Sequence, residues 1–168
     1  VNVMSRETVL RQYVDEVKNG YDYVLLDCRP SLGMLVINAL SASDYVLIPV
    51  QAEYFAAENM TELVNTVQSI KRQINPKLKI GGVFMTMANE TNFRKDIVAS
   101  VKAAYGKHLP IMQTVVPATV RLAEISTADH SIFVHEPKGR AAEAYRTLVK
   151  EVMEIGEKQR SKSSDLSR

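Results

Sequence analysis

Short apolar runs alternate with helical patterns along most of this chain, and this alternation constrains the fold more than any other feature. The apolar runs lie at residues 21–28, 44–50, 78–87 and 111–116. Periodic apolar positions predict helices at about residues 5–19, 32–42, 56–74, 92–105, 118–127 and 139–156. Parallel strands need crossover helices, which cover both faces of their sheet. We therefore expect an α/β fold with a mostly parallel sheet and helices on both faces.

The size and composition of the chain fit one globular domain. At 168 residues, it can bury about two-thirds of the surface that its unfolded chain exposes. Residues 157–168 hold four basic and two acidic side chains and almost no apolar ones, so we expect a disordered polar tail there. The body, residues 1–156, then has no net charge. Any nucleic-acid surface on it must be a local patch.

Several classes of protein are disfavoured by simple counts. One cysteine, Cys28, cannot form an internal disulfide, and three scattered histidines do not have the spacing of zinc ligands. The chain has no run of 18 apolar residues and no basic-then-apolar leader at Val1. We expect a cytoplasmic protein that does not bind membranes.

An acidic residue, Asp27, ends the first apolar run. It is followed at once by a restricted turn that contains Pro30, Ser31 and Gly33. In open parallel sheets, ligands bind beyond the carboxyl ends of the strands. A carboxylate at that place can hold a hydrated magnesium ion, and the turn can present backbone N–H groups to a phosphate. The simpler alternative is that Asp27 only suits a turn, as aspartate often does.

Five ordered segments resemble those of ParA/Soj-type partition ATPases, which are relatives of MinD. The segments read DCRPSLGMLVINAL, SASDYVLIPVQAEYFAAENM, INPKLKIGGVFMTM, VVPATVRLAEIS and EPKGRAAEAYRTLVKEV. They extend over residues 27–152 at the spacing of the family. The resemblance implies a P-loop NTPase-type (deviant Walker) domain that binds ATP and Mg²⁺.

The resemblance also assigns roles to individual residues. It makes Asp27 the Walker B acid, a catalytic residue that holds magnesium through water. The loop that responds to ATP would contain Arg29, Pro30, Ser31 and Gly33. Thr86, Met87 and Pro117 would border the adenine. A purely structural role is an equal alternative for Thr86 and Met87, because methionine often fills irregular gaps in a core.

The phosphate-binding loop of the family has no counterpart in these 168 residues. Such a loop follows the pattern G-x-x-x-x-G-K-[ST]. The one Gly-Lys pair, at Gly106 and Lys107, is followed by His108 and has no glycine at position 101. The chain therefore resembles the C-terminal part of a partition ATPase, and the domain is incomplete. We expect no tight binding of ATP or Mg²⁺ and no hydrolysis by this chain alone. An absent central strand would also leave an apolar sheet edge unpaired.

Positions related to DNA binding are only partly retained. Arg121 keeps the basic character of the family, and we expect it to contact DNA. Glu90 and His130 stand where the family often has basic residues. An ion pair with Glu124, three residues further along a short helix, is the competing role for Arg121.

Two other departures lie close to the nucleotide. Arg29 replaces a proline of the family, and Ala118 replaces an arginine. Both substitutions could alter the binding of the nucleotide.

The resemblance implies that the complete protein dimerises, binds DNA without sequence preference and segregates plasmids or chromosomes with a ParB-like stimulating partner. A non-catalytic scaffold or partner-binding module is the alternative. A MinD-like membrane-targeted ATPase is disfavoured, because the C-terminal residues EKQRSKSSDLSR do not form an amphipathic helix with bulky apolar side chains.

Overall fold

A computed structural model describes residues 6–29, 33–51, 57–88, 93–125 and 130–165. Its residues fall into two compact units. The first unit comprises residues 1–46 and 56–80, and the second comprises residues 47–55 and 81–168.

The first unit is built mainly from helices. After a short 3₁₀ turn at Arg6–Thr8 come α1 (Val9–Val17), a second 3₁₀ turn (Lys18–Gly20), α2 (Met34–Ala42) and α3 (Ala57–Gln73). Leu40 of α2 packs with Val67 and Ile70 of α3 and with Leu78, which is fully buried. Apolar residues at helical spacing thus join α2 and α3 through one core.

Hydrogen bonds from a buried asparagine and a half-buried arginine stabilise the C-terminal end of α2. The amide of Asn75 donates to the carbonyl oxygens of Leu40 (3.0 Å) and Ser43 (2.7 Å), just where α2 ends. Arg11 of α1 donates through Nε to the carbonyl oxygen of Ser41 at 2.8 Å. Carbonyl groups at the end of a helix lack partners within the helix, and these donors satisfy them.

The strand predicted at residues 21–28 is wrong for this structure. Residues 21–29 form no strand, and most of their side chains are exposed; Leu25 is 85% exposed. An extended segment becomes a strand only when a neighbouring backbone pairs with its N–H and C=O groups, and an apolar sequence does not supply that neighbour. The exposed run fits the expectation that another segment would pair here. That pairing stays a prediction.

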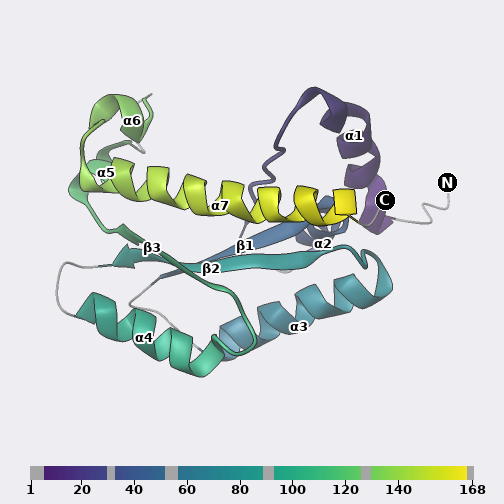
Figure 1. The fold of residues 1–168 in the computed structure, drawn as a ribbon, viewed down its shortest axis with the longest axis horizontal. Coiled ribbons are helices and arrows are strands. Elements are labelled where there is room, and N and C mark those ends of the chain that lie inside the picture. The colour runs from purple at the N-terminus through teal and green to yellow at the C-terminus, as the bar shows by residue number, and fades with distance from the viewer. Residues whose placement is uncertain (1–5, 30–32, 52–56, 89–92, 126–129, 166–168) are drawn as a thin grey trace. The chain divides into compact units, whose positions relative to one another are not determined.

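The described residues form a three-stranded sheet in the order β1-β2-β3. Its strands are β1 (Tyr45–Gln51), β2 (Lys79–Ala88) and β3 (Ile111–Pro117). The first two residues of β1 and of β2 belong to the first unit, and the rest of the sheet belongs to the second. β2 and β3 are parallel, and α4 (Phe93–Tyr105) connects them (Figure 1). The parallel α/β sheet predicted from the sequence is confirmed.

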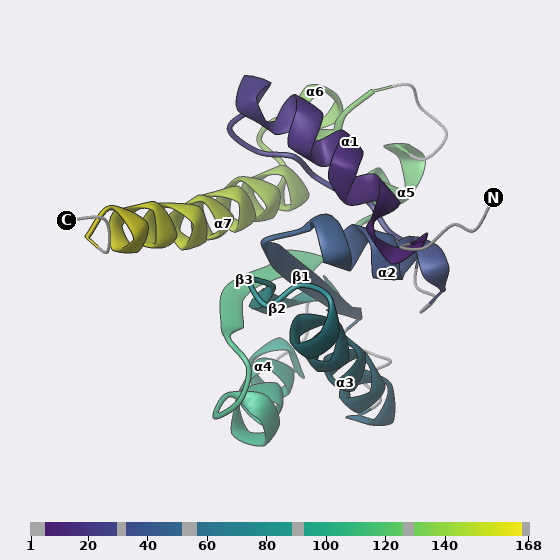
Figure 2. The ribbon, with the colours of Figure 1, turned by 90° about the vertical axis from the view of Figure 1, so that its right-hand side faces the viewer.

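Helices lie on both sides of β3. Met112 and Val116 pack against Leu148 of α7 (Arg140–Asp165), whereas Gln113 accepts a hydrogen bond from Lys102 of α4 at 3.0 Å. Side chains alternate between the faces of a strand, so these contacts place α7 and α4 on opposite faces. Figure 2 shows the two helices on either side of β3.

Two details at the C-terminal end differ from the sequence prediction. A four-residue helix, α6 (Ile132–His135), lies between α5 (Val120–Ile125) and α7 and was not predicted. The helix predicted for residues 139–156 is α7, which continues to Asp165 through the polar segment expected to be disordered. Glu, Lys, Gln and Arg have good helix propensity, which lets a helix continue without apolar residues. The division into a body and a tail stays a prediction.

Glu151 of α7 forms hydrogen bonds with β3 where the register between β2 and β3 shifts. Between the paired positions Val83↔Ile111 and Met85↔Val115, one residue of β2 stands opposite three of β3. The carboxylate of Glu151 accepts hydrogen bonds from the backbone N–H groups of Gln113 (3.0 Å) and Thr114 (2.8 Å), and also contacts the Thr114 hydroxyl. One side chain therefore satisfies donors that the bulge removes from the ladder.

We expect Glu151→Ala to lower the free energy of unfolding by about 2 kcal/mol, because it leaves these donors without their carboxylate. Glu151→Gln should cost about half as much, since its amide oxygen still accepts. Urea denaturation followed by circular dichroism measures both. Lys150→Ala, at an exposed position of the same helix, serves as the control. An equal effect of Lys150→Ala and Glu151→Ala would contradict this role.

Candidate functional site

The segment around Asp27 lies in the first unit. Asp27 and Arg29 are exposed, whereas Pro30 and Ser31 lie outside the described residues. Gly33 is the N-cap of α2, and its carbonyl oxygen accepts from the N–H groups of Val36 (3.0 Å) and Ile37 (3.2 Å). The chain therefore passes from an exposed carboxylate to the start of a helix within seven residues. A helix start presents N–H groups that have no partner within the helix.

The chemistry of Asp27 fits magnesium held mainly by water and phosphate. Among the residues that the structure describes, no three His, Cys, Asp or Glu side chains gather as a set of metal ligands. Magnesium is usually bound by one or two carboxylates together with waters and substrate phosphates. One exposed carboxylate satisfies that requirement.

Thr86, Met87 and Pro117 are brought together in the second unit, where β2 and β3 end. Ala88 stands opposite Pro117 in the register, and the N–H of Ala118 donates to the carbonyl oxygen of Ala88 at 3.1 Å. The Thr86 hydroxyl donates to the carbonyl oxygen of Val50 in β1 at 3.4 Å. The predicted adenine-side residues therefore share the carboxyl end of the sheet, which is where ligands bind in folds of this kind.

Met87 has an unusual backbone conformation at this edge. Its φ of 52° lies in the left-handed region, and its side chain is 56% exposed. The register shifts between Met85 and Ala88, so Met87 lies in a bulge of β2. A side chain in that region costs on the order of 1 kcal/mol, and such strain is concentrated at functional sites. A core-filling role for Met87 does not fit this exposure.

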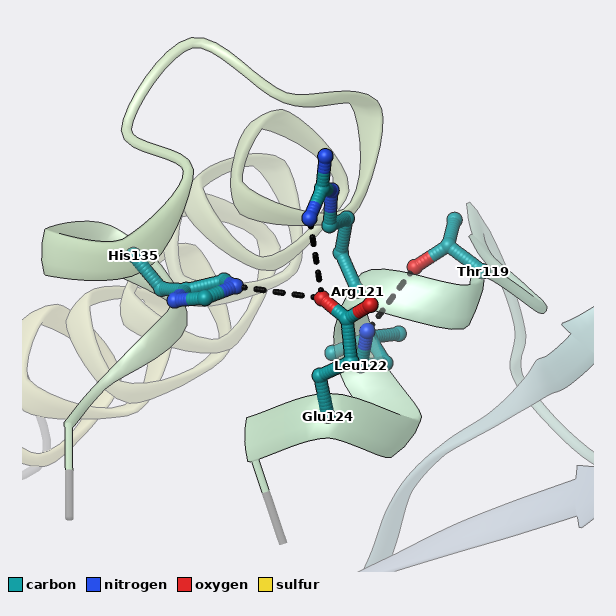
Figure 3. Close-up of polar contacts among 5 residues, drawn as sticks. All are labelled: Thr119, Arg121, Leu122, Glu124 and His135. Carbon is teal, nitrogen blue, oxygen red and sulfur yellow. Dashed lines mark hydrogen bonds and ion pairs between the residues drawn. The ribbon is translucent and has the colours of Figure 1, made fainter. Parts of the chain in front are cut away.

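Arg121 is placed by a capped helix directly after β3. The hydroxyl of Thr119 accepts a hydrogen bond from the N–H of Leu122 at 3.1 Å, which caps the start of α5. Arg121 Nη1 donates to Oε2 of Glu124 at 3.0 Å, and His135 Nε2 of α6 lies 3.3 Å from the same oxygen (Figure 3). The ion pair weighed as the competing role of Arg121 is thus present.

The three polar side chains remain accessible to water. The exposed fractions of the side chains are 57% for Arg121, 43% for Glu124 and 29% for His135. The hydrogen bond from Arg121, followed by that from His135, lowers the pKa of the Glu124 carboxyl. The same carboxylate raises the pKa of the Arg121 guanidinium. Glu124 is therefore ionised and Arg121 is cationic at neutral pH.

The predicted site residues thus fall into two groups that belong to different units. Asp27, Arg29 and Gly33 lie in the first unit, and the adenine-side residues and Arg121 lie in the second. Ala118 and His130 are exposed, and Glu90 lies outside the described residues. Sequence reasoning missed His135. Spacing could suggest the pair of Arg121 with Glu124, but it could not indicate a contact with a separate short helix.

Comparison with known proteins identifies relatives over nearly the whole chain. A family model described as an AAA domain matches residues 1–80. The sporulation initiation inhibitor protein Soj of Bacillus subtilis is 42% identical over 157 residues, which is 93% of this chain and 61% of Soj. The chromosome partitioning protein ParA of Myxococcus xanthus is 37% identical over 154 residues, 91% of this chain and 54% of ParA.

The chain is homologous to Soj and ParA proteins, with 36–42% identity over most of its length. It spans less than two-thirds of the length of these curated relatives. Within the part of the chain that the structure describes, no helix is long and apolar enough to cross a membrane.

Solved structures share the fold of this chain. Cobyrinic acid a,c-diamide synthase from Mycobacterium smegmatis, with bound ADP and magnesium, superposes with a TM-score of 0.71 at 27% identity. The match covers 87% of this chain and 52% of that one. A structure described as a partition protein has a TM-score of 0.58 at 20% identity over 74% of this chain, which supports the fold alone. The P-loop NTPase-type fold predicted from the sequence is confirmed.

Proposed function

We propose that this chain is part of a cytoplasmic partition ATPase. In its complete form, the protein binds ATP and magnesium, dimerises, binds DNA without sequence preference and segregates plasmids or chromosomes with a ParB-like partner. The observation that carries this proposal is the 42% identity to Soj over 157 residues. The magnesium and ADP named for the structurally similar synthase support the nucleotide and the metal.

Asp27 would hold the magnesium ion through water, and the segment from Arg29 to Gly33 would face the terminal phosphate. Magnesium, when bound, neutralises charge that develops on the phosphates during transfer. An exposed carboxylate seven residues before the start of α2 supports this role, because a helix start favours an anion nearby.

Thr86, Met87 and Pro117 would border the adenine. The exposed, left-handed Met87 supports this role, because its side chain extends from the carboxyl end of β2 and does not fill the core. The hydroxyl of Thr86 already has a backbone partner in Val50, so this residue would mainly support the shape of the pocket.

Arg121 would contact DNA phosphate. Its guanidinium is more than half exposed and stands on a helix that begins where β3 ends. Phosphate contacts fix the position of a protein on DNA but do not read its sequence. The proposed binding is therefore weak, non-specific and sensitive to salt.

We expect Arg121→Ala to weaken DNA binding by the full-length, ATP-loaded protein about five- to tenfold on unrelated sequences. The loss of one phosphate contact should also reduce the slope of log K against log salt by about 0.9. Fluorescence anisotropy at two or more salt concentrations measures both. Arg146→Ala is a matched control, because Arg146 pairs with an acid three residues away, Glu143, in the same unit. If Arg121→Ala keeps the affinity and the slope of the wild type, Arg121 has only a structural role.

A further inference from the structure

The guanidinium group of Arg121, which we propose contacts DNA, already forms an ion pair with a carboxylate of the protein. Glu124 Oε2 accepts the hydrogen bond of Arg121 Nη1 at 3.0 Å. A carboxylate and a phosphate both offer anionic oxygens to arginine, in similar geometry. The contact within the protein therefore takes one of the five N–H donors that Arg121 could offer to a DNA phosphate.

His135 shares this carboxylate from the other side. Its Nε2 lies 3.3 Å from the oxygen that Arg121 contacts. If Arg121 turns toward a phosphate, Glu124 keeps His135 as a neighbour (Figure 3). When a phosphate replaces Glu124 as the partner of Arg121, the Glu124 carboxylate therefore still contacts His135. Pairs between exposed side chains are weak, so a phosphate can compete with Glu124.

The helices that carry these groups are held in place by packing and by caps. Leu122 and Ile125 of α5 pack against a core that contains Ile132 of α6. The hydroxyl of Ser131 caps α6 by accepting from the N–H of Phe133 at 3.2 Å. The backbone positions of Arg121, Glu124 and His135 are thus set by apolar contacts and not by the ion pair. Removing the charge of Glu124 should leave the fold unchanged.

The local charge also opposes an approaching phosphate. Arg121 and Glu124 together have no net charge, and the carboxylate of Glu136 acts on Arg121 from the end of α6. A neutral amide in place of Glu124 would remove the negative charge that Arg121 contacts directly and would leave only the carboxylate of Glu136 to compensate the guanidinium.

We propose that Glu124 is a positioning residue that holds Arg121 and competes with DNA phosphate for it, so that Glu124 limits the DNA affinity of the complete protein. The proposal rests on the proposed DNA contact of Arg121. In this proposal, Arg121 raises the affinity for DNA, whereas Glu124 lowers it.

The test uses the full-length, ATP-loaded protein and mixed-sequence duplex DNA. Glu124→Gln should raise the affinity roughly threefold at low salt, since one charge a few ångströms from a phosphate is removed, and the gain should fade as salt is added. In an Arg121→Ala background, the same substitution should gain much less. Glu143→Gln removes the same charge from a longer, 3.5 Å pair with Arg146 on α7, so it measures the general effect of net charge. Circular dichroism melting confirms that each variant is folded.

The results separate the two proposals. If Arg121→Ala weakens binding but Glu124→Gln does not strengthen it beyond Glu143→Gln, the competition is refuted and the DNA contact stands. If Arg121→Ala has no effect, both fail. An equal gain from Glu124→Gln with and without Arg121 would also refute the proposal, because the carboxylate would then repel DNA without acting through Arg121.

Discussion

Purified residues 1–168 are expected to show no ATP turnover above a blank without protein. Phosphoryl transfer depends on positioning and on electrostatic stabilisation of the phosphates. In P-loop enzymes, a glycine-rich backbone and its lysine supply much of both, and this sequence contains no G-x-x-x-x-G-K-[ST] pattern. Asp27 can serve the metal, but it cannot hold the β- and γ-phosphates. A coupled assay of phosphate release over hours, at millimolar ATP and magnesium, measures the expected absence.

The informative control is a chain extended upstream to include a phosphate-binding loop. That protein should hydrolyse ATP, whereas the 168-residue chain should not. Turnover by the short chain that disappears in its Asp27→Ala variant would show that the missing loop is not required. If the extended protein bound no nucleotide at all, the scaffold alternative would replace the enzyme. The two proteins together therefore separate an incomplete ATPase from a non-catalytic module.

The fold was largely predictable because its strands and helices have local signals. The runs at 44–50, 78–87 and 111–116 became β1, β2 and β3, and the helices between them appeared within a few residues of their expected ends. An apolar run also predicted a strand at residues 21–28, and that prediction failed. An apolar run indicates that a segment can be buried, but it does not show that a neighbouring strand is present to pair with it. The helix from residue 157 to Asp165 was missed for the opposite reason. It continues without apolar positions, which periodicity cannot detect.

The candidate site was predictable to a smaller degree. The end of an apolar run suggested Asp27, and the resemblance to partition ATPases suggested Thr86, Met87 and Pro117. The structure brings the last three together. The left-handed φ of Met87 had no sequence signal, since such a conformation usually requires glycine or asparagine. The contact of His135 with Glu124 depends on how α5 and α6 pack, which no spacing along the chain encodes. Sequence patterns therefore located the edge of the sheet better than the side-chain contacts beside it.

In the extended protein, Asp27→Ala should reduce ATP turnover at least about a hundredfold, which corresponds to roughly 2.7 kcal/mol of lost transition-state stabilisation. The physical reason is that a carboxylate holding magnesium through water acts on the metal and not on the core. Asp27 is exposed and has no place in the buried clusters of the described residues, so the free energy of unfolding should change by less than about 0.5 kcal/mol.

The decisive measurement of this role is the magnesium dependence of Asp27→Ala, not its rate alone. A variant that has lost its metal ligand should need much more magnesium for nucleotide binding, whereas binding without magnesium should match that of the wild type. Asp22→Ala removes a carboxylate five residues earlier in the same exposed segment and should behave as the wild type does. Unchanged magnesium dependence in Asp27→Ala would show that this residue only ends an extended segment. Equal losses in both variants would instead indicate a general effect of negative charge, because a specific ligand at position 27 would not be mimicked by position 22.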